Sequence, residues 1–239
     1  APFGLDMYSV RINIIADPND ITAVVSTLRN LNFIVPGNSE FASLALDPLL
    51  EIYNKSALNA KECSSYGSLV EFGNKLKVFQ IAVEDDQSWN EESSDILLFE
   101  MGTLSPIGSS SSNSANGSSG SYIKKVMDEG KVSVFNNWKA LSLFDTFTML
   151  GHCIPDSIVD NWVANYFGML YISELNIKFY LFRLNNDFRL NYKSADKLLE
   201  QFDEFDYGCW FDNVSYNFLP RLIHRSMEQG LDIISEKQR

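Results

Sequence analysis

The chain has 239 residues, of which 45% are hydrophobic, 13% aromatic and 21% charged, a composition typical of soluble globular proteins. A chain of this length can bury a sizeable core without disulfides or structural metal ions. It carries 31 acidic residues against 19 lysines and arginines, for a net charge of −12. This charge argues against direct binding to nucleic acid or to an anionic membrane surface, because phosphate groups require a positive surface.

The N-terminal half predicts alternating strands and helices. Residues 8–15 alternate apolar and polar side chains as a half-buried strand does, and residues 21–28 repeat apolar side chains at helical spacing. A second strand is expected at 31–35, which makes a βαβ-like opening, and helical spacing returns over 41–53. Further along, a Gly-Asn turn separates predicted strands at 69–72 and 76–83, and another strand is expected at 96–100.

The C-terminal half predicts a comparable mixture. Gly151 is suited to end a helix, Ser194 to cap one, and Pro220 to lie in a first helical turn. From these signals and the apolar spacing we expect strands at 131–135 and 175–184 and helices at 138–151, 157–166, 194–205 and 220–234. The chain as a whole therefore predicts an α+β fold, with a mixed sheet packed with helices.

A Ser-, Gly- and Asn-rich segment, residues 105–121, divides the sequence into two halves. Such a composition is typical of a flexible linker or of a loop that tolerates insertions. Residues 1–104 hold 15 acidic and 6 basic side chains, a net charge of −9, whereas residues 122–239 hold 16 and 13, a net charge of −3. We expect an acidic α/β half at 1–104 and an α+β half at 122–239, which could also form one domain together.

The cysteines and the hydropathy pattern bear on the compartment. Cys63, Cys153 and Cys209 are widely spaced and include no Cys-x-x-Cys pair, as expected of reduced thiols in a cytosolic protein. No signal peptide is visible, and no apolar run reaches the roughly 20 residues that a membrane-spanning helix needs. The sequence therefore predicts a cytoplasmic or nuclear location and no membrane span.

Motifs for nucleotide, zinc and serine-hydrolase chemistry are missing from the sequence. It contains no GxxxxGK[ST], GxGxxG, HExxH or GxSxG pattern, and its two histidines are too few for a multi-histidine metal site. The sharpest catalytic candidate is His152 beside Cys153, but adjacent residues on an extended segment point to opposite faces, so His152 is not expected to serve Cys153. His224 could act on Cys153 or Cys209 only if folding brings them together. We assign no catalytic residue, metal or cofactor.

Two acidic clusters are candidates for binding a protein partner. The first surrounds the end of the predicted strand at 76–83, and the second interleaves acids with aromatic side chains near residue 205. Clustered negative charge steers association with a basic partner, and aromatic anchors rimmed by charge are typical of protein interfaces. The alternative is that the first is a solvated loop, and the second an amphipathic helix with its aromatic stripe in the core. The candidate partner-binding residues are Glu84, Asp85, Asp86, Trp89, Glu91, Glu92, Asp203, Asp206 and Trp210.

These observations favour a non-enzymatic, acidic intracellular protein that binds another protein, as a complex subunit, an adaptor, or an inhibitor or immunity-type protein. A first alternative is a small hydrolase-type enzyme using carboxylates or a Cys/His pair, with Asp203, Asp206, Cys153 and His224 as its residues. A second is a structural component that assembles with copies of itself. The sequence leaves the oligomeric state and the identity of the partner open.

Overall fold

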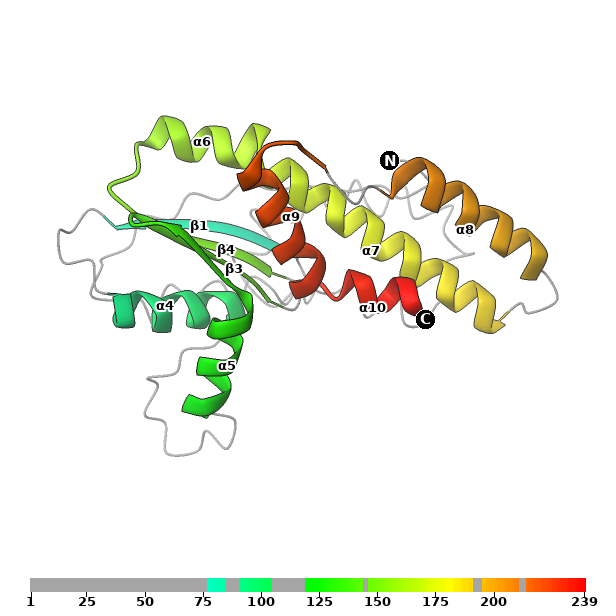
Figure 1. Ribbon diagram of the computed structural model, residues 1–239, viewed down its shortest axis with the longest axis horizontal. Coiled ribbons are helices and arrows are strands. Elements are labelled where there is room, and N and C mark those ends of the chain that lie inside the picture. Colours follow the sequence, from blue (N-terminus) through cyan, green and yellow to red (C-terminus); the bar gives the residue numbers. More distant parts are fainter. Residues whose placement is uncertain (1–76, 85–90, 105–118, 144–145, 191–194, 211–213) are drawn as a thin grey trace, which may run out of the picture. The chain divides into compact units, whose positions relative to one another are not determined.

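The computed structural model describes residues 77–84, 91–104, 119–143, 146–190, 195–210 and 214–239 (Figure 1). Contacts divide the chain into two compact units. Nearly all described residues belong to one of them, which includes the described parts of Phe79–Thr103 and Ser118–Arg239. The elements predicted before residue 76 lie outside the described residues, as does most of the predicted linker.

A four-stranded mixed sheet forms the centre of this unit. Its spatial order is β1-β4-β3-β2, and β3 pairs antiparallel with both β2 and β4. The strands are β1 (Val78–Glu84), β2 (Lys131–Phe135), β3 (Trp138–Leu143) and β4 (Thr146–His152). The predicted α+β class, a mixed sheet packed with helices, is confirmed.

Helices cover both faces of the sheet (Figure 1). Leu141 and Thr148 face α4, where an added Cβ at Gly102 would meet their side chains. On the opposite face, Trp138 and Phe147 join the core formed with α7 and α9. The helices are α4 (Glu91–Thr103), α5 (Gly120–Gly130), α6 (Asp156–Asn165), α7 (Phe167–Leu190), α8 (Ala195–Cys209), α9 (Phe218–Gly230) and α10 (Ile233–Gln238).

Predictions that rested on strong local signals are confirmed. The strands expected at 76–83 and 131–135 appear as β1 and β2, and the helix expected at 157–166 appears as α6. The helix expected from 194 extends as α8 to Cys209, and the one expected at 220–234 appears as α9 followed by the short α10. At the start of α5, the Ser119 hydroxyl accepts a hydrogen bond from the backbone N–H of Tyr122 at 3.2 Å.

Three predictions of element type are wrong. Residues 96–100 lie in α4, residues 138–143 and 146–151 lie in the two strands of the β3–β4 hairpin, and residues 175–184 lie inside α7. In the hairpin, burial is almost continuous because helices cover both faces of the sheet, so the strands lack the alternation that marks a half-exposed strand. In α7, the buried side chains recur three and four residues apart, at Tyr171, Leu175, Lys178 and Leu181, which is a helical face.

Aromatic side chains fill the layer between the sheet and helices α6 and α7. The ring of Phe79 stacks on Phe147 with centroids 5.5 Å apart, and Trp138 meets Trp162 edge to face at 5.7 Å. These contacts bury large apolar surfaces, which is the main source of stability for the unit. Among the helices that the structure describes, none has the length and apolar character needed to cross a membrane.

Candidate functional site

The first predicted acidic cluster spans the connection between β1 and α4. Glu84 is the last residue of β1, and Glu91 and Glu92 are the first two residues of α4. Asp85, Asp86 and Trp89 lie outside the described residues. Binding of a basic partner at this cluster therefore stays a prediction.

The second predicted cluster lies on α8, which has one buried and one exposed face. Leu198 and Phe205 are buried, and Phe205 packs against Tyr180 of α7 with ring centroids 4.6 Å apart. Phe202, on the same side as Leu198 and Phe205, is partly buried in the core. The aromatic stripe of this helix thus fills the core at these positions, as one of the two interpretations of the sequence expected.

The opposite face of α8 carries exposed acidic side chains together with one aliphatic and one aromatic side chain. Residues 196, 200, 203 and 207 are four, three and four positions apart, so they share one side of the helix. On it lie the exposed carboxylates of Asp196, Glu200 and Asp203, beside Leu199 with 51% and Tyr207 with 94% of its surface exposed. Within the described part of the chain, no ion pair or side-chain hydrogen bond engages these three carboxylates. We call this set of five residues the α8 outer face.

Asp206 and Trp210, at the end of α8, hold a lysine of the same chain. The ammonium group of Lys237, in α10, forms an ion pair with the Asp206 carboxylate. The same ammonium lies 4.0 Å from the centroid of the Trp210 ring, within the range of a cation–π interaction. Of the three predicted partner-binding residues in this region, Asp203 therefore faces outward on α8, and Asp206 and Trp210 contact Lys237.

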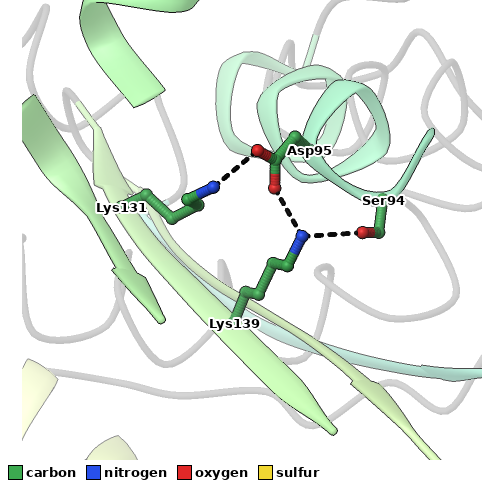
Figure 2. Close-up of polar contacts among 4 residues, drawn as sticks. All are labelled: Ser94, Asp95, Lys131 and Lys139. Carbon is green, nitrogen blue, oxygen red and sulfur yellow. Dashed lines mark hydrogen bonds and ion pairs between the residues drawn. The ribbon is translucent and has the colours of Figure 1, made fainter. Parts of the chain in front are cut away.

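A separate polar cluster around Asp95 joins α4 to the sheet (Figure 2). Asp95 accepts hydrogen bonds from Lys131 Nζ at 2.5 Å and from Lys139 Nζ at 2.7 Å. Lys139 also donates to Ser94 Oγ at 2.9 Å. Because Lys131 pairs in register with Leu141, Lys139 lies on the same face of the sheet as Lys131, so one carboxylate can serve both lysines. This arrangement fixes α4 over β2 and β3.

A buried histidine connects α7 to α9. His224 Nδ1 lies 2.8 Å from Glu174 Oε1, and both side chains are almost wholly buried. Its Nε2 atom lies 3.6 Å from a carboxylate oxygen of Glu228, one turn further along α9. The ring nitrogens of His224 thus face carboxylates, as expected for a polar contact that links two packed helices.

The interpretation of His152 and Cys153 as pointing to opposite faces is wrong. His152 Nε2 lies 3.3 Å from Cys153 Sγ, and Cys153 is exposed. The reason is the backbone of Cys153, whose φ of 50° lies in the left-handed region. The chain therefore leaves the extended conformation at this residue, and the alternation of side chains that a strand imposes no longer applies.

The candidate residues predicted from the sequence include neither Tyr207, although it lies in the second acidic cluster, nor Lys237. The helical spacing of Asp196, Glu200, Asp203 and Tyr207 was a usable signal for the α8 outer face, because it places an aromatic side chain in line with three acids. No local signal links Lys237 to Asp206, which is distant in the sequence. Among the described residues, no group of three or more histidine, cysteine or acidic side chains is placed to hold a metal ion.

Comparisons of the chain with protein-family models, with curated proteins and with solved structures find no match.

Proposed function

We propose that this chain is a non-enzymatic binding protein whose α8 outer face binds a basic segment of another protein. The observation that carries the proposal is the exposure of Tyr207 in line with three carboxylates that no described residue neutralises. A tyrosine supplies apolar contact area and a hydroxyl group with little conformational freedom to lose, and it is enriched among the residues that dominate binding energy.

The charge of the chain supports a basic partner over an acidic or neutral one. The net charge of −12 attracts cations at long range, and Asp196, Glu200 and Asp203 concentrate negative charge at one surface. Such charge complementarity chiefly raises the association rate. Tyr207, once it is buried against the partner, chiefly slows dissociation. Binding at this face should therefore weaken as the salt concentration rises.

The first experiment is native mass spectrometry of the protein captured gently from its own cells, followed by binding measurements with the partner so identified. Tyr207→Ala should weaken binding by about tenfold or more, and Asp203→Asn should slow association a few-fold. Tyr216→Ala and Asp128→Asn are matched controls, because Tyr216 is fully exposed outside α8 and Asp128 is exposed on α5. A stoichiometric partner whose affinity is unchanged by Tyr207→Ala would contradict the proposal, as would a chain that only associates with itself.

A hydrolase-type activity is the second candidate function, and one observation favours it. His152 Nε2 is within hydrogen-bonding distance of the exposed Cys153 thiol, so it can accept the thiol proton as the sulfur attacks an acyl carbon. An activated ester such as p-nitrophenyl acetate tests this function. Turnover that is lost in both Cys153→Ser and His152→Asn would favour the enzyme, and a single stoichiometric acylation without turnover would exclude it.

A further inference from the structure

The end of α8 provides two kinds of interaction for a lysine ammonium, an ion pair and a cation–π contact. Asp206 supplies a carboxylate and Trp210 the face of an indole ring, and the ammonium of Lys237 contacts both. The carboxylate attracts the cation by direct charge, and the ring attracts it through its quadrupole. These two residues therefore constitute a site for a lysine side chain, and its occupant in this structure belongs to the same chain.

Contacts other than Lys237 anchor α10. Ile233 is fully buried, and Asn185 Nδ2 of α7 donates to the backbone oxygen of Glu236 at 2.8 Å and to its Oε2 at 3.2 Å. The side chain of Lys237 can therefore leave Asp206 and Trp210 without α10 leaving α7.

The Lys237 contact is also accessible to a competitor. The side chain of Lys237 is 26% exposed and that of Asp206 is 45% exposed, so both side chains remain partly in contact with solvent, although the Asp206 Oδ1 atom that contacts Lys237 is buried. Ion pairs between exposed groups contribute little net stability, because water solvates both charges when they separate. An ammonium group arriving from outside meets no large barrier to exchange.

We propose that Asp206 and Trp210 bind a lysine side chain of the basic partner, and that Lys237 is an internal competitor for this site. The inference rests on the proposed function and adds to it the residue type recognised and a means of regulation. Asp206 adjoins Tyr207 and lies three residues beyond Asp203, so the site is continuous with the α8 outer face. Because Lys237 is tethered beside the site, it competes at a high effective concentration and lowers the apparent affinity for the partner.

The test uses the full chain and a synthetic lysine-rich helical peptide as the probe, with the same peptide acetylated on every lysine as its control. Lys237→Met keeps most of the aliphatic stem and removes the competing ammonium. It should tighten binding of the unmodified peptide by about three- to tenfold relative to wild type, given the size of exposed cation–π and ion-pair interactions. The acetylated peptide should bind neither protein.

A control variant and a resonance at the site separate this effect from the change in total charge. Lys124→Met, on an exposed position of α5, removes one positive charge far from Asp206 in the sequence and should leave the affinity near that of wild type. The indole N–H resonance of Trp210, assigned with Trp210→Phe, should shift when the peptide is added to Lys237→Met. Should the methionine variant fail to fold, Lys237→Gln replaces it.

The possible outcomes distinguish this inference from the proposed function. Equal affinities for Lys237→Met and Lys124→Met would overturn the inference, and the proposed function would stand if Tyr207→Ala still weakened binding. A different outcome would support the inference and overturn the proposal that the α8 outer face binds the partner. In it, peptide binding does not respond to Tyr207→Ala, becomes tighter in Lys237→Met, and is lost again when Asp206→Asn is added. A peptide that binds none of these proteins overturns both.

Discussion

Asp95 is expected to stabilise the sheet unit because it is the shared counter-charge of two lysines. Its carboxylate lies 2.5 Å from Lys131 Nζ and 2.7 Å from Lys139 Nζ, and the Lys139 side chain is only 4% exposed. Asp95→Asn keeps the size of the side chain and removes its charge. Two ammonium groups on neighbouring strands then lose their common partner, and one of them is nearly inaccessible to water.

The magnitude follows from the burial of the three groups. Breaking a buried ion pair by removing one partner costs about 3–5 kcal/mol, whereas an exposed pair contributes roughly 0–1 kcal/mol. Asp95 and Lys131 are 25% and 20% exposed, so water compensates part of the loss, and Ser94 Oγ still accepts from Lys139. We expect Asp95→Asn to lower the free energy of unfolding by about 2–3 kcal/mol. This corresponds to a fall in Tm of roughly 5–10 °C.

Urea unfolding followed by tryptophan fluorescence and far-ultraviolet circular dichroism measures this loss. Asp128→Asn makes the same chemical change at an exposed site of α5 and should stay within about 0.5 kcal/mol of wild type. In a Lys139→Met background, Asp95→Asn should cost much less, because no buried ammonium then loses its counter-charge. A loss below about 0.5 kcal/mol, or an equal loss in both backgrounds, would refute the reasoning.

Three further changes are testable in the same unfolding assay. Gly230→Ala should lower the free energy of unfolding by about 2–3 kcal/mol, since its Cβ would lie 2.2 Å from a backbone oxygen of β3. Gly208→Ala has open space around it and should raise the free energy of unfolding by up to about 1 kcal/mol. Equal effects of the two substitutions would contradict the packing at Gly230. Ser119→Ala should cost about 1 kcal/mol by removing the α5 cap, and Ser119→Thr should restore most of it; no loss would show that the cap contributes nothing. Burial raises the pKa of Tyr180 above its ordinary 10.0, opposed by Arg183 and assisted by Glu204 and Cys209. The unfolded chain therefore loses this phenolic proton at a lower pH than the folded chain, so stability should fall as the pH rises past about 10. Tyr180→Phe should make that fall less steep. Ultraviolet titration of the Tyr180 phenol tests the raised pKa independently.

Several elements could be predicted from local sequence. The strand at 131–135 and the helix at 157–166 appear where the residue pattern places them, and the helix expected from 194 begins one residue later. In each case the signal lies within a few residues, as alternation, helical spacing or a capping residue. The amphipathic character of α8, with acids on one side and Phe205 on the other, was readable for the same reason.

Other features depended on tertiary contacts. The hairpin of β3 and β4 is buried on both faces, and its buried residues include polar ones such as Lys139, Ser142 and Thr148, so the apolar residues alone do not mark it as a pair of strands. Inside α7, a stretch with strand-like alternation is helical because its buried face packs on the sheet and on α9. Packing against distant segments, and not the local pattern, decides the structure of such stretches.

The sequence by itself determined the composition of the candidate binding surface: an acidic chain, with Asp203 and Tyr207 spaced to share one side of a helix. Only the tertiary structure decided which charges are neutralised within the molecule. Asp206 contacts Lys237, and Asp95 contacts Lys131 and Lys139, across separations of many residues. A carboxylate is open to a partner without an internal competitor only if folding brings no cation to it, and this depends on how the helices pack and not on the residues beside it in the chain.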